Sequence, residues 1–281
     1  MRTLFIILAA LFVQHASSQE LFVVTEPASN VPAGSLSFKL GQSRMKEKFE
    51  EGFNYHMMPE ITWGINKNLM VRASGFISNR NSNGNNTDLK TEGASLYAKY
   101  RFLSTDDVHS HFRMATFGRY SINNADIHQE ELETMGHNTG FEAGLVATKL
   151  IKKIAISSSV SLEKVGDNKP NYPFPDGQSD MAFNYTLSFG KLMYPKKYTD
   201  YKQTNINLMF EIVGQTLNEN QRSFLDVVPS IQFIINSQAR IDLAYKQQLY
   251  SSMLRSAPNG VYLNLQYNFF NLYRSKQTIK S

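Results

Sequence analysis

The segment NADIHQEELETMGH, residues 124–137, concentrates side chains that can bind metal ions. Carboxylate oxygens and imidazole nitrogens within a short stretch of chain can converge on a divalent cation. The candidates are His128, Glu130, Glu131, Glu133, Met135 and His137. A short helix is predicted in this segment, because Asp126 can cap its start, Gln129 follows three residues later and Gly136 can end it. Because no definite ligand spacing is present, a solvated acidic loop is the alternative, and we predict no metal site.

Nucleophilic catalysis would need a serine or aspartate beside a histidine base. His56, which adjoins the sequence MMPE, and His137 are the two candidates for that base, and the spacing identifies a partner for neither. The turn DDVHSH (106–111), with His109 and His111, is equally unspecific. The sequence has no cysteine, which excludes thiolate metal sites, a cysteine nucleophile and disulfides. We therefore predict neither an enzyme nor a cofactor.

The first residues, MRTLFIILAALFVQHASSQE, have the composition of a secretory signal peptide. A basic start precedes a short apolar run, and small residues stand where cleavage requires them. We predict a leader over 1–18 that is cut before Gln19. Removal of Arg2 with this leader lowers the formal charge from +5 to +4, which is too weakly basic to indicate nucleic acid as a partner.

The rest of the chain alternates apolar and polar residues, as in ARIDLAYKQQL (239–249), where Ile241, Leu243 and Tyr245 share one parity. Twelve such segments are predicted, near Ser35, Tyr55, Asn68, Glu92, His111, Asn138, Lys153, Asp180, Asn205, Phe224, Ala239 and Gly260. Each is about ten to twelve residues long. Strands of globular domains are mostly about 5 to 6 residues, whereas a tilted strand that crosses a membrane needs about 9 to 11. The lengths favour membrane-spanning strands.

The connections between these segments alternate in length. The short ones are INKN (65–68), STDDVHS (104–110), the join at 150–152 and NSQA (236–239). The long ones are 43–53, 79–90, 122–136, 164–178, 215–221 and 250–259, and the exception is 194–204, which is long where a short turn is expected. Such alternation is typical of a membrane barrel with short turns on one side and long loops on the other.

One parity of each strand is apolar and uncharged, as in Leu69, Val71 and Ala73. The opposite parity holds eight basic and five acidic residues, a balance of +3. They are Lys39, Glu60, Arg72, Lys99, Arg101, Arg113, Arg119, Glu142, Glu211, Asp226, Arg240, Asp242 and Lys246. Since a lipid-facing charge costs about 2 to 4 kcal/mol at the bilayer midplane, these residues are predicted to line the lumen of a barrel.

Aromatic residues gather at one end of the apolar faces, as an interfacial girdle does. The predicted girdle comprises Trp63, Tyr100, Phe102, Phe112, Phe189, Phe233 and Phe269, all toward the short turns. Pro59 and Pro229 lie inside apolar faces, and each removes a backbone donor. We expect a bulge or a locally weakened strand pair at both prolines.

The last predicted strand, GVYLNLQYNFF, alternates apolar residues from Val261 to Phe269 and ends in an aromatic pair. With the twelve segments, it makes residues 35–270 resemble a Gram-negative outer-membrane β-barrel, in particular a small porin-like channel. The resemblance implies an all-β, antiparallel up-and-down barrel of 12 strands in the cell outer membrane. It also implies a monomer that contacts lipid and lipopolysaccharide and is inserted by the barrel assembly machinery. Such barrels usually stop at the final aromatic, whereas here a tail, 271–281, follows.

The interior of a barrel of this size must be occupied by polar groups. We expect either a narrow channel for small polar or anionic solutes or a lumen packed with ion pairs that passes little. The segment 19–34 contains Pro27 and Pro32 and is predicted to be extended, either as a plug or as a loose periplasmic lead. A passive channel is the predicted function. The alternatives are a lipid- or lipopolysaccharide-modifying enzyme and an accessory barrel that binds a partner through its loops.

Overall fold

The computed structural model describes residues 22–49, 51–79, 88–107, 110–168, 172–195 and 203–272. The predicted leader, His109 and most of the predicted tail lie outside these residues. The described chain forms twelve strands and no helix, which confirms the predicted fold class. The strands are β1 Leu36–Lys46, β2 Phe53–Gly64, β3 Leu69–Ser78, β4 Lys90–Asp106, β5 Ser110–Asn123, β6 Thr139–Ile151, β7 Ile154–Gly166, β8 Met181–Tyr194, β9 Asn205–Leu217, β10 Ser223–Ile235, β11 Ala239–Ser251 and β12 Asn259–Phe269.

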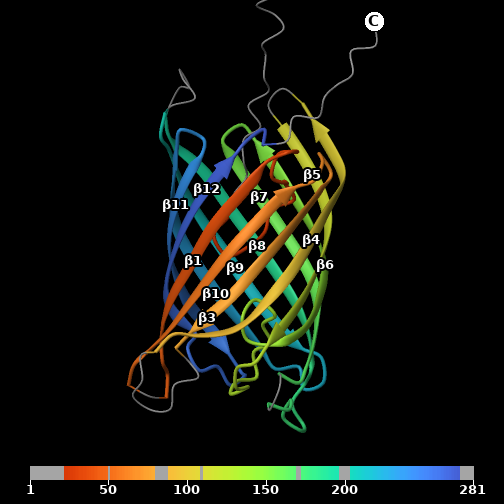
Figure 1. Ribbon diagram of the computed structural model, residues 1–281, viewed down its shortest axis with the longest axis vertical. Helices are drawn as coiled ribbons and strands as arrows, with labels where there is room; N and C mark the ends of the chain where they lie inside the picture. The colour runs from red at the N-terminus through yellow and green to blue at the C-terminus, as the bar shows by residue number, and fades with distance from the viewer. Residues whose placement is uncertain are drawn as a thin grey trace, which may run out of the picture.

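The strands form a closed barrel in which each pairs antiparallel with its neighbours in sequence, and β1 closes the ring on β12. Leu36 of β1 stands opposite Trp63 on one side and Phe269 on the other. Figure 1 shows tilted strands around one axis, with short turns at the top and long loops at the bottom. Closure leaves no unpaired sheet edge. No helix that could cross a bilayer occurs in the part of the chain that the structure describes.

Side chains of opposite parity lie on opposite sides of the barrel wall. Leu96 and Phe141 on the outer face are 67% and 62% exposed, whereas Glu211 and Asp242 on the inner face are fully buried. An apolar outer face is compatible with a hydrocarbon environment because the closed ladder satisfies the backbone without water. The wall is thus apolar outside and polar inside.

Strand pairing is interrupted at both prolines, as predicted. The β2–β3 ladder has no pairs between Met57 and Glu60, around Pro59. The β10–β11 ladder has a matching gap around Pro229. The register is the same on both sides of each gap, so the loss of the proline donor weakens the pairing locally without a bulge at that position.

The end of the barrel with the short turns is called here the turn rim, and the opposite end the loop rim. At the turn rim, the tight turn between β10 and β11 has Asn236 and Ser237 at φ of 51° and 56°, in the left-handed region. The connection that departs from the alternation, 194–204, also falls at this rim, but its residues 196–202 lie outside the described chain.

Candidate functional site: the occupied lumen

All thirteen charged residues that were predicted to line the lumen are buried or half-buried. Most of them form ion pairs within the wall: Lys39 Nζ lies 3.1 Å from Glu60 Oε2, Arg119 Nη1 lies 2.5 Å from Glu142 Oε2, and Arg240 Nη2 lies 2.8 Å from Asp242 Oδ2. Arg101 stands apart, because it lies near the turn rim and donates from Nη2 to the backbone oxygen of Lys67 at 2.5 Å.

The structure adds six charged lumen residues to the predicted thirteen. They are Glu26, Glu92, Glu131, Glu133, Glu163 and Arg255. Together the two sets give nine basic and ten acidic residues among those described. The +3 balance predicted from strand parity is therefore cancelled by carboxylates on the outer loop, on the N-terminal segment and on β4 and β7.

Glu92 shows why parity failed at one position. The β3–β4 ladder pairs Phe76 with Gly93 and then Ile77 with Thr91, which leaves Glu92 as the extra residue of a bulge. The bulge turns this carboxylate inward, where it accepts a hydrogen bond from Ser78 Oγ. Glu163, in contrast, shares the inward parity of its strand, so strict alternation would have found it.

The segment 22–35, named here the inner segment, lies inside the barrel, and Figure 1 draws it in red within the ring of strands. Its backbone binds the carboxylate of Glu211 on β9. The amide of Val23 donates to Oε1 at 2.9 Å, and the amides of Val24 and Thr25 donate to Oε2 at 3.2 and 2.7 Å. Successive amides that converge on one anion form a concave anion site, here with the wall supplying the anion.

The side chain of Glu26 joins the inner segment to the opposite part of the wall. It pairs with Arg72 on β3, and its Oε2 lies 3.3 Å from Lys99 Nζ on β4. Burial opposes ionisation of Glu26, but the positive charges of Arg72 and then Lys99 outweigh it and hold the pKa of this carboxyl well below its usual range. Glu26 is therefore an anion that bridges the segment to two strands.

The rest of the inner segment follows the wall toward the turn rim. Ala28 is fully buried, and its amide donates to Thr148 Oγ1 at 2.8 Å. Arg113 Nη1 donates to Ser29 Oγ at 2.8 Å. Gly34 donates its amide to the backbone oxygen of Gly64 at 2.8 Å. These contacts with β2, β5 and β6 complete a path across the half of the lumen next to the turn rim.

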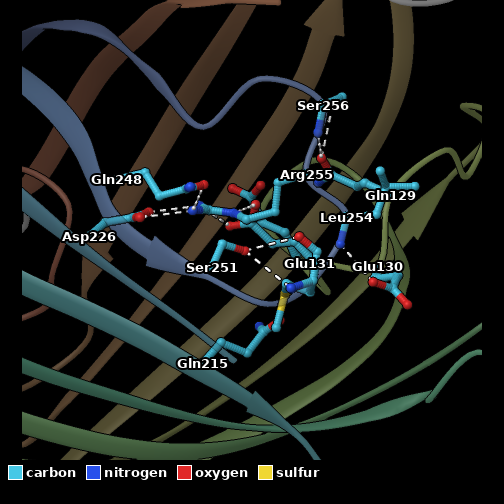
Figure 2. Close-up of polar contacts among 12 residues, drawn as sticks. Gln129, Glu130, Glu131, Gln215, Asp226, Gln248, Ser251, Leu254, Arg255 and Ser256 are labelled. Atoms are coloured by element: carbon cyan, nitrogen blue, oxygen red, sulfur yellow. Dashed lines mark hydrogen bonds and ion pairs between the residues drawn. The ribbon is translucent and has the colours of Figure 1, made fainter. Parts of the chain in front are cut away.

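Residues 124–138, named here the outer loop, fold into the lumen at the loop rim. Figure 2 shows its main anchor, the wholly buried guanidinium of Arg255, between Glu131 of the outer loop and Asp226 of β10. Arg255 Nε lies 2.7 Å from Glu131 Oε2, and its Nη1 and Nη2 lie 2.8 and 2.7 Å from the two oxygens of Asp226. Arg255 comes from the loop between β11 and β12, where no periodic pattern exists to indicate burial.

Arg255 is held as a cation. Burial disfavours its charged form, but Glu131 and then Asp226 overcome that effect and raise its pKa further above the usual value. Two forked carboxylate contacts on one guanidinium fix its position as well as its charge. The outer loop is thus tied to both β10 and the β11–β12 loop by a single buried side chain.

Backbone contacts seat the remainder of the outer loop. Gln215 of β9 accepts from the amide of Leu132 at 2.9 Å and donates to its carbonyl at 2.7 Å. The amide of Thr134 donates to Glu163. The short helix predicted for this segment is absent: the outer loop is irregular and has only one turn, near Gly136. Wall side chains take up several of its backbone groups, and a single hydrogen bond of helical spacing, from His137 to Glu133, remains.

The candidate metal ligands of the outer loop have other partners. Glu130 binds Arg222, Glu131 binds Arg255, and His128 Nε2 lies 3.1 Å from Ser256 Oγ. His137 Nδ1 lies 3.1 Å from Glu133 Oε2. Within the described ranges, no group of three or more His, Cys, Asp or Glu side chains is arranged to hold a metal ion. Met135 lines the lumen cavity described below.

The two candidate catalytic histidines come together. The rings of His56 and His137 lie 6.2 Å apart, and both line the interior of the barrel. Gly136, at φ +139°, lies against the ring of His56 so closely that a Cβ there would be 2.7 Å from it. Both rings therefore lie inside the barrel and not on its apolar outer face. At the other rim, His111 Nδ1 lies 2.7 Å from Asp106 Oδ1.

The predicted girdle aromatics lie on the outer face. Trp63, Tyr100, Phe102, Phe189 and Phe269 are exposed, and Phe112 and Phe233 are half-buried. Phe38 and Phe269 make an edge-to-face contact with ring centroids 5.8 Å apart. Other exposed aromatics, such as Tyr120 and Phe141, lie toward the loop rim.

A cavity of about 200 Å³ remains between the inner segment and the outer loop. Its wall comes mainly from β1, β2 and β12, where inward residues such as Ser37, Gly41 and Ser43 are small. Phe22 to Asn30 of the inner segment border it on one side, and Gln129 to His137 of the outer loop border it on the other. The lumen thus contains two inserted segments with a polar cavity between them.

Comparison with known proteins identifies the fold. The sequence matches no protein-family model and no curated protein. It is similar in structure to the COG4313 outer membrane channel from Pseudomonas putida F1, with a TM-score of 0.55 and 10% identity over 88% of this chain and 99% of that one. The KdgM porin gives a TM-score of 0.46 at 7% identity, over 84% and 99% of the two chains. The beta domain of the Bordetella autotransporter Brka gives 0.49 at 9% identity, over 85% and 100%. The protein therefore has the fold of outer-membrane β-barrel proteins.

Proposed function

We propose that the protein is a passive outer-membrane channel for small polar solutes and that the inner segment closes it. The observation that carries this proposal is the cavity of about 200 Å³ that lies between two inserted segments in the lumen. A barrel packed only for rigidity has no need of such a space. The apolar outer face supports an outer-membrane location, in contact with lipid and lipopolysaccharide after insertion by the barrel assembly machinery.

The charge distribution favours uncharged solutes over anions. The thirteen predicted residues alone give the lumen an excess of basic charge, but the added carboxylates bring the described residues to nine basic and ten acidic. Selectivity in a pore follows from the charges that line it, and paired charges exert little net field along the path. A passive channel for small polar solutes, without a preference for anions, agrees with this balance.

Opening requires displacement of the inner segment, because it crosses the lumen from Glu211 to Arg72. Its hydrogen bonds with the wall are individually modest, about 0.5–1.5 kcal/mol each between neutral groups and about 1.5–3 where one group is charged. Phe22 and Val23 add apolar packing against Met209, Val228 and Ala244. A segment held by such bonds can leave the lumen without unfolding the barrel.

A disulfide that locks the inner segment tests the proposal. Thr25 Oγ1 and Ser188 Oγ lie 2.7 Å apart, so cysteines at both positions place two sulfur atoms within reach of a bond of about 2.0 Å. The chain has no other cysteine. In planar bilayers, we expect the oxidised Thr25→Cys/Ser188→Cys protein to stay closed and to regain wild-type openings after addition of a reductant.

The single variants Thr25→Cys and Ser188→Cys are the controls and should conduct like the wild type under both conditions. An oxidised double variant that conducts as well as the reduced one would show that the inner segment is not the gate. A fully inserted wild-type protein that passes no ions and causes no swelling of liposomes in any polar solute would contradict the channel itself.

A further inference from the structure

We propose that the cavity between the inner segment and the outer loop is a binding site for an uncharged polyhydroxylated solute the size of a single sugar ring. The inference deepens the proposed function, since it names the class of solute, and it relies on that function only for passage through the barrel. Binding itself depends on the cavity alone.

Size sets the first limit on the solute. A cavity of about 200 Å³ is somewhat larger than one of about 150 Å³ that accepts a benzene ring. A single sugar ring or a polyol of similar size fills that space, whereas a disaccharide exceeds it. The space exists because Gly41 faces inward on β1: a Cβ there would lie 3.2 Å from Asn264 Oδ1 and 3.6 Å from the carbonyl oxygen of Met58.

Charge sets the second limit. The basic residues that line the cavity each have a carboxylate within ion-pair distance, such as Glu60 beside Lys39 at 3.1 Å and Asp226 beside Lys246 at 3.4 Å. A charged solute would have to compete with these built-in partners, and its own loss of hydration would not be recovered. A neutral solute meets no such cost.

The remaining polar lining suits hydroxyl groups. Asn54, Asn264 and Gln266 present amides from β2 and β12, and Tyr262 adds a phenol. The Oδ1 atoms of Asn54 and Asn30 are buried and find no hydrogen-bond donor among the described residues. A buried acceptor left without a partner costs about 1–3 kcal/mol, and a solute hydroxyl would remove that cost.

The apolar lining suits the carbon face of the same solute. The thioether side chains of Met45, Met58, Met70 and Met135 line the cavity among the amides. Methionine is flexible and polarizable and adapts to irregular shapes. A ring with hydroxyls at its edge and C–H groups on its faces matches a site that offers amides and thioethers together.

Equilibrium dialysis of the full-length protein in detergent tests the inference. The probes are radiolabelled glucose and mannitol, with gluconate and glucosamine as charged compounds of the same size and maltose as the larger one. We expect saturable binding of glucose or mannitol at one site per chain. Gluconate, glucosamine and maltose should bind at least about tenfold more weakly, a difference of about 1.4 kcal/mol.

Gly41→Leu should abolish this binding by filling the cavity. Gly118→Leu is the matched control, since a Cβ at Gly118 would have no atom nearer than 3.9 Å and its neighbour Ala98 belongs to the exposed face. Asn264→Leu is a second variant that removes an amide without adding bulk to β1, and it should also lose binding while keeping the heat-resistant gel mobility of a folded barrel.

The outcomes separate this inference from the proposed function. Absence of saturable glucose and mannitol binding, or gluconate binding as tight as glucose binding, would overturn the inference, even if liposome swelling demonstrated passage of polar solutes. Saturable binding that Gly41→Leu removes would support the site even in a barrel that passed no solute. Binding unchanged in both Gly41→Leu and Asn264→Leu would place the solute elsewhere and refute the assignment.

Discussion

The outer loop and the inner segment both occupy the lumen, but different kinds of contact hold them. The outer loop is fixed by side chains, above all by Arg255 between Glu131 and Asp226. The inner segment is fixed by three backbone amides that bind Glu211, by the ion pairs of Glu26 and by the apolar packing of Phe22 and Val23. Removal of a buried charged side chain leaves its partners unpaired, whereas a backbone held by a wall carboxylate can leave as a unit. The difference indicates a fixed constriction at the loop rim and a releasable closure near the turn rim.

The comparison predicts its largest effect at Arg255. Arg255→Met leaves Glu131 and Asp226 buried with Lys246 as their remaining cation, at 3.8 and 3.4 Å. Breaking a buried ion pair in this way costs about 3–5 kcal/mol. Urea titration of the folded barrel in detergent, followed by gel mobility, should show that loss. Arg222→Met is the control, because its pair with Glu130 is half exposed and should change stability by less than about 1 kcal/mol.

If Arg255→Met left the stability of the barrel unchanged, Arg255 would not be the residue that holds the outer loop in the lumen. The triple variant Arg255→Met/Glu131→Gln/Asp226→Asn tests whether unpaired charge causes the loss of stability. It removes both carboxylate charges together with the arginine, so it should recover a large part of the lost free energy of unfolding. A triple variant as unstable as Arg255→Met would mean that packing of the arginine, and not charge, holds the loop.

The second effect concerns release of the inner segment. Glu211→Gln replaces a carboxylate that accepts three amide bonds with a neutral amide that offers one acceptor oxygen. The loss of charge-assisted bonding should weaken docking by about 1–2 kcal/mol, so open-channel probability should rise about five- to thirtyfold. Single-channel recording measures it. Glu142→Gln is the control, since Glu142 binds Arg119 and Ser161 of the wall, and the same probability in both variants would contradict the assigned role.

The third effect is a pH dependence of the inner segment. The pKa of Glu26 is lowered in the folded protein, so its ionised form favours docking. That contribution is complete above the ordinary glutamate pKa of about 4.3 and is lost as the pH falls through the lower folded value. We expect a protease to cleave the inner segment faster in Glu26→Gln than in the wild type. This difference in cleavage rate should be constant from about pH 8 to pH 5 and should shrink below about pH 4. A difference that already shrinks near neutral pH would contradict this sign.

The smallest effect is expected at a proline in the wall, remote from the outer loop and the inner segment. Pro229→Val restores a backbone donor in the gap of the β10–β11 ladder. One regained hydrogen bond contributes about 0.5–1.5 kcal/mol, and the added freedom of the unfolded chain offsets part of it. Hydrogen exchange at Tyr245 and neighbouring amides should slow, with gating unchanged. Exchange that stays fast would show that the gap has a cause other than the missing donor.

The wall was predictable from sequence because alternation and strand length report directly on a ladder with lipid on one side. All twelve strands were predicted in their places, and the gaps at Pro59 and Pro229 follow from a missing donor. The outer loop and the inner segment were harder to predict from the sequence. Glu211 is bound by backbone amides of the inner segment, which are the same for nearly all residue types. The side chains of the segment therefore do not indicate this contact. Arg255 lies in an irregular loop, and a bulge turns Glu92 inward against its parity.

The inner segment also has a consequence for the order of assembly. Val23 is bound by Glu211, 188 residues further along the chain. Contacts of such large sequence separation form late, because the intervening chain must first lose its freedom. The amides of the inner segment therefore have no partner at Glu211 until β9 has joined the wall. Leu272, just past β12, donates its amide to Gly34 at 3.0 Å, so the end of the described chain meets the exit of that same segment. Docking of the inner segment thus depends on completion of the barrel wall, and a barrel that stalls before its last strand joins would lack the contact between Leu272 and Gly34.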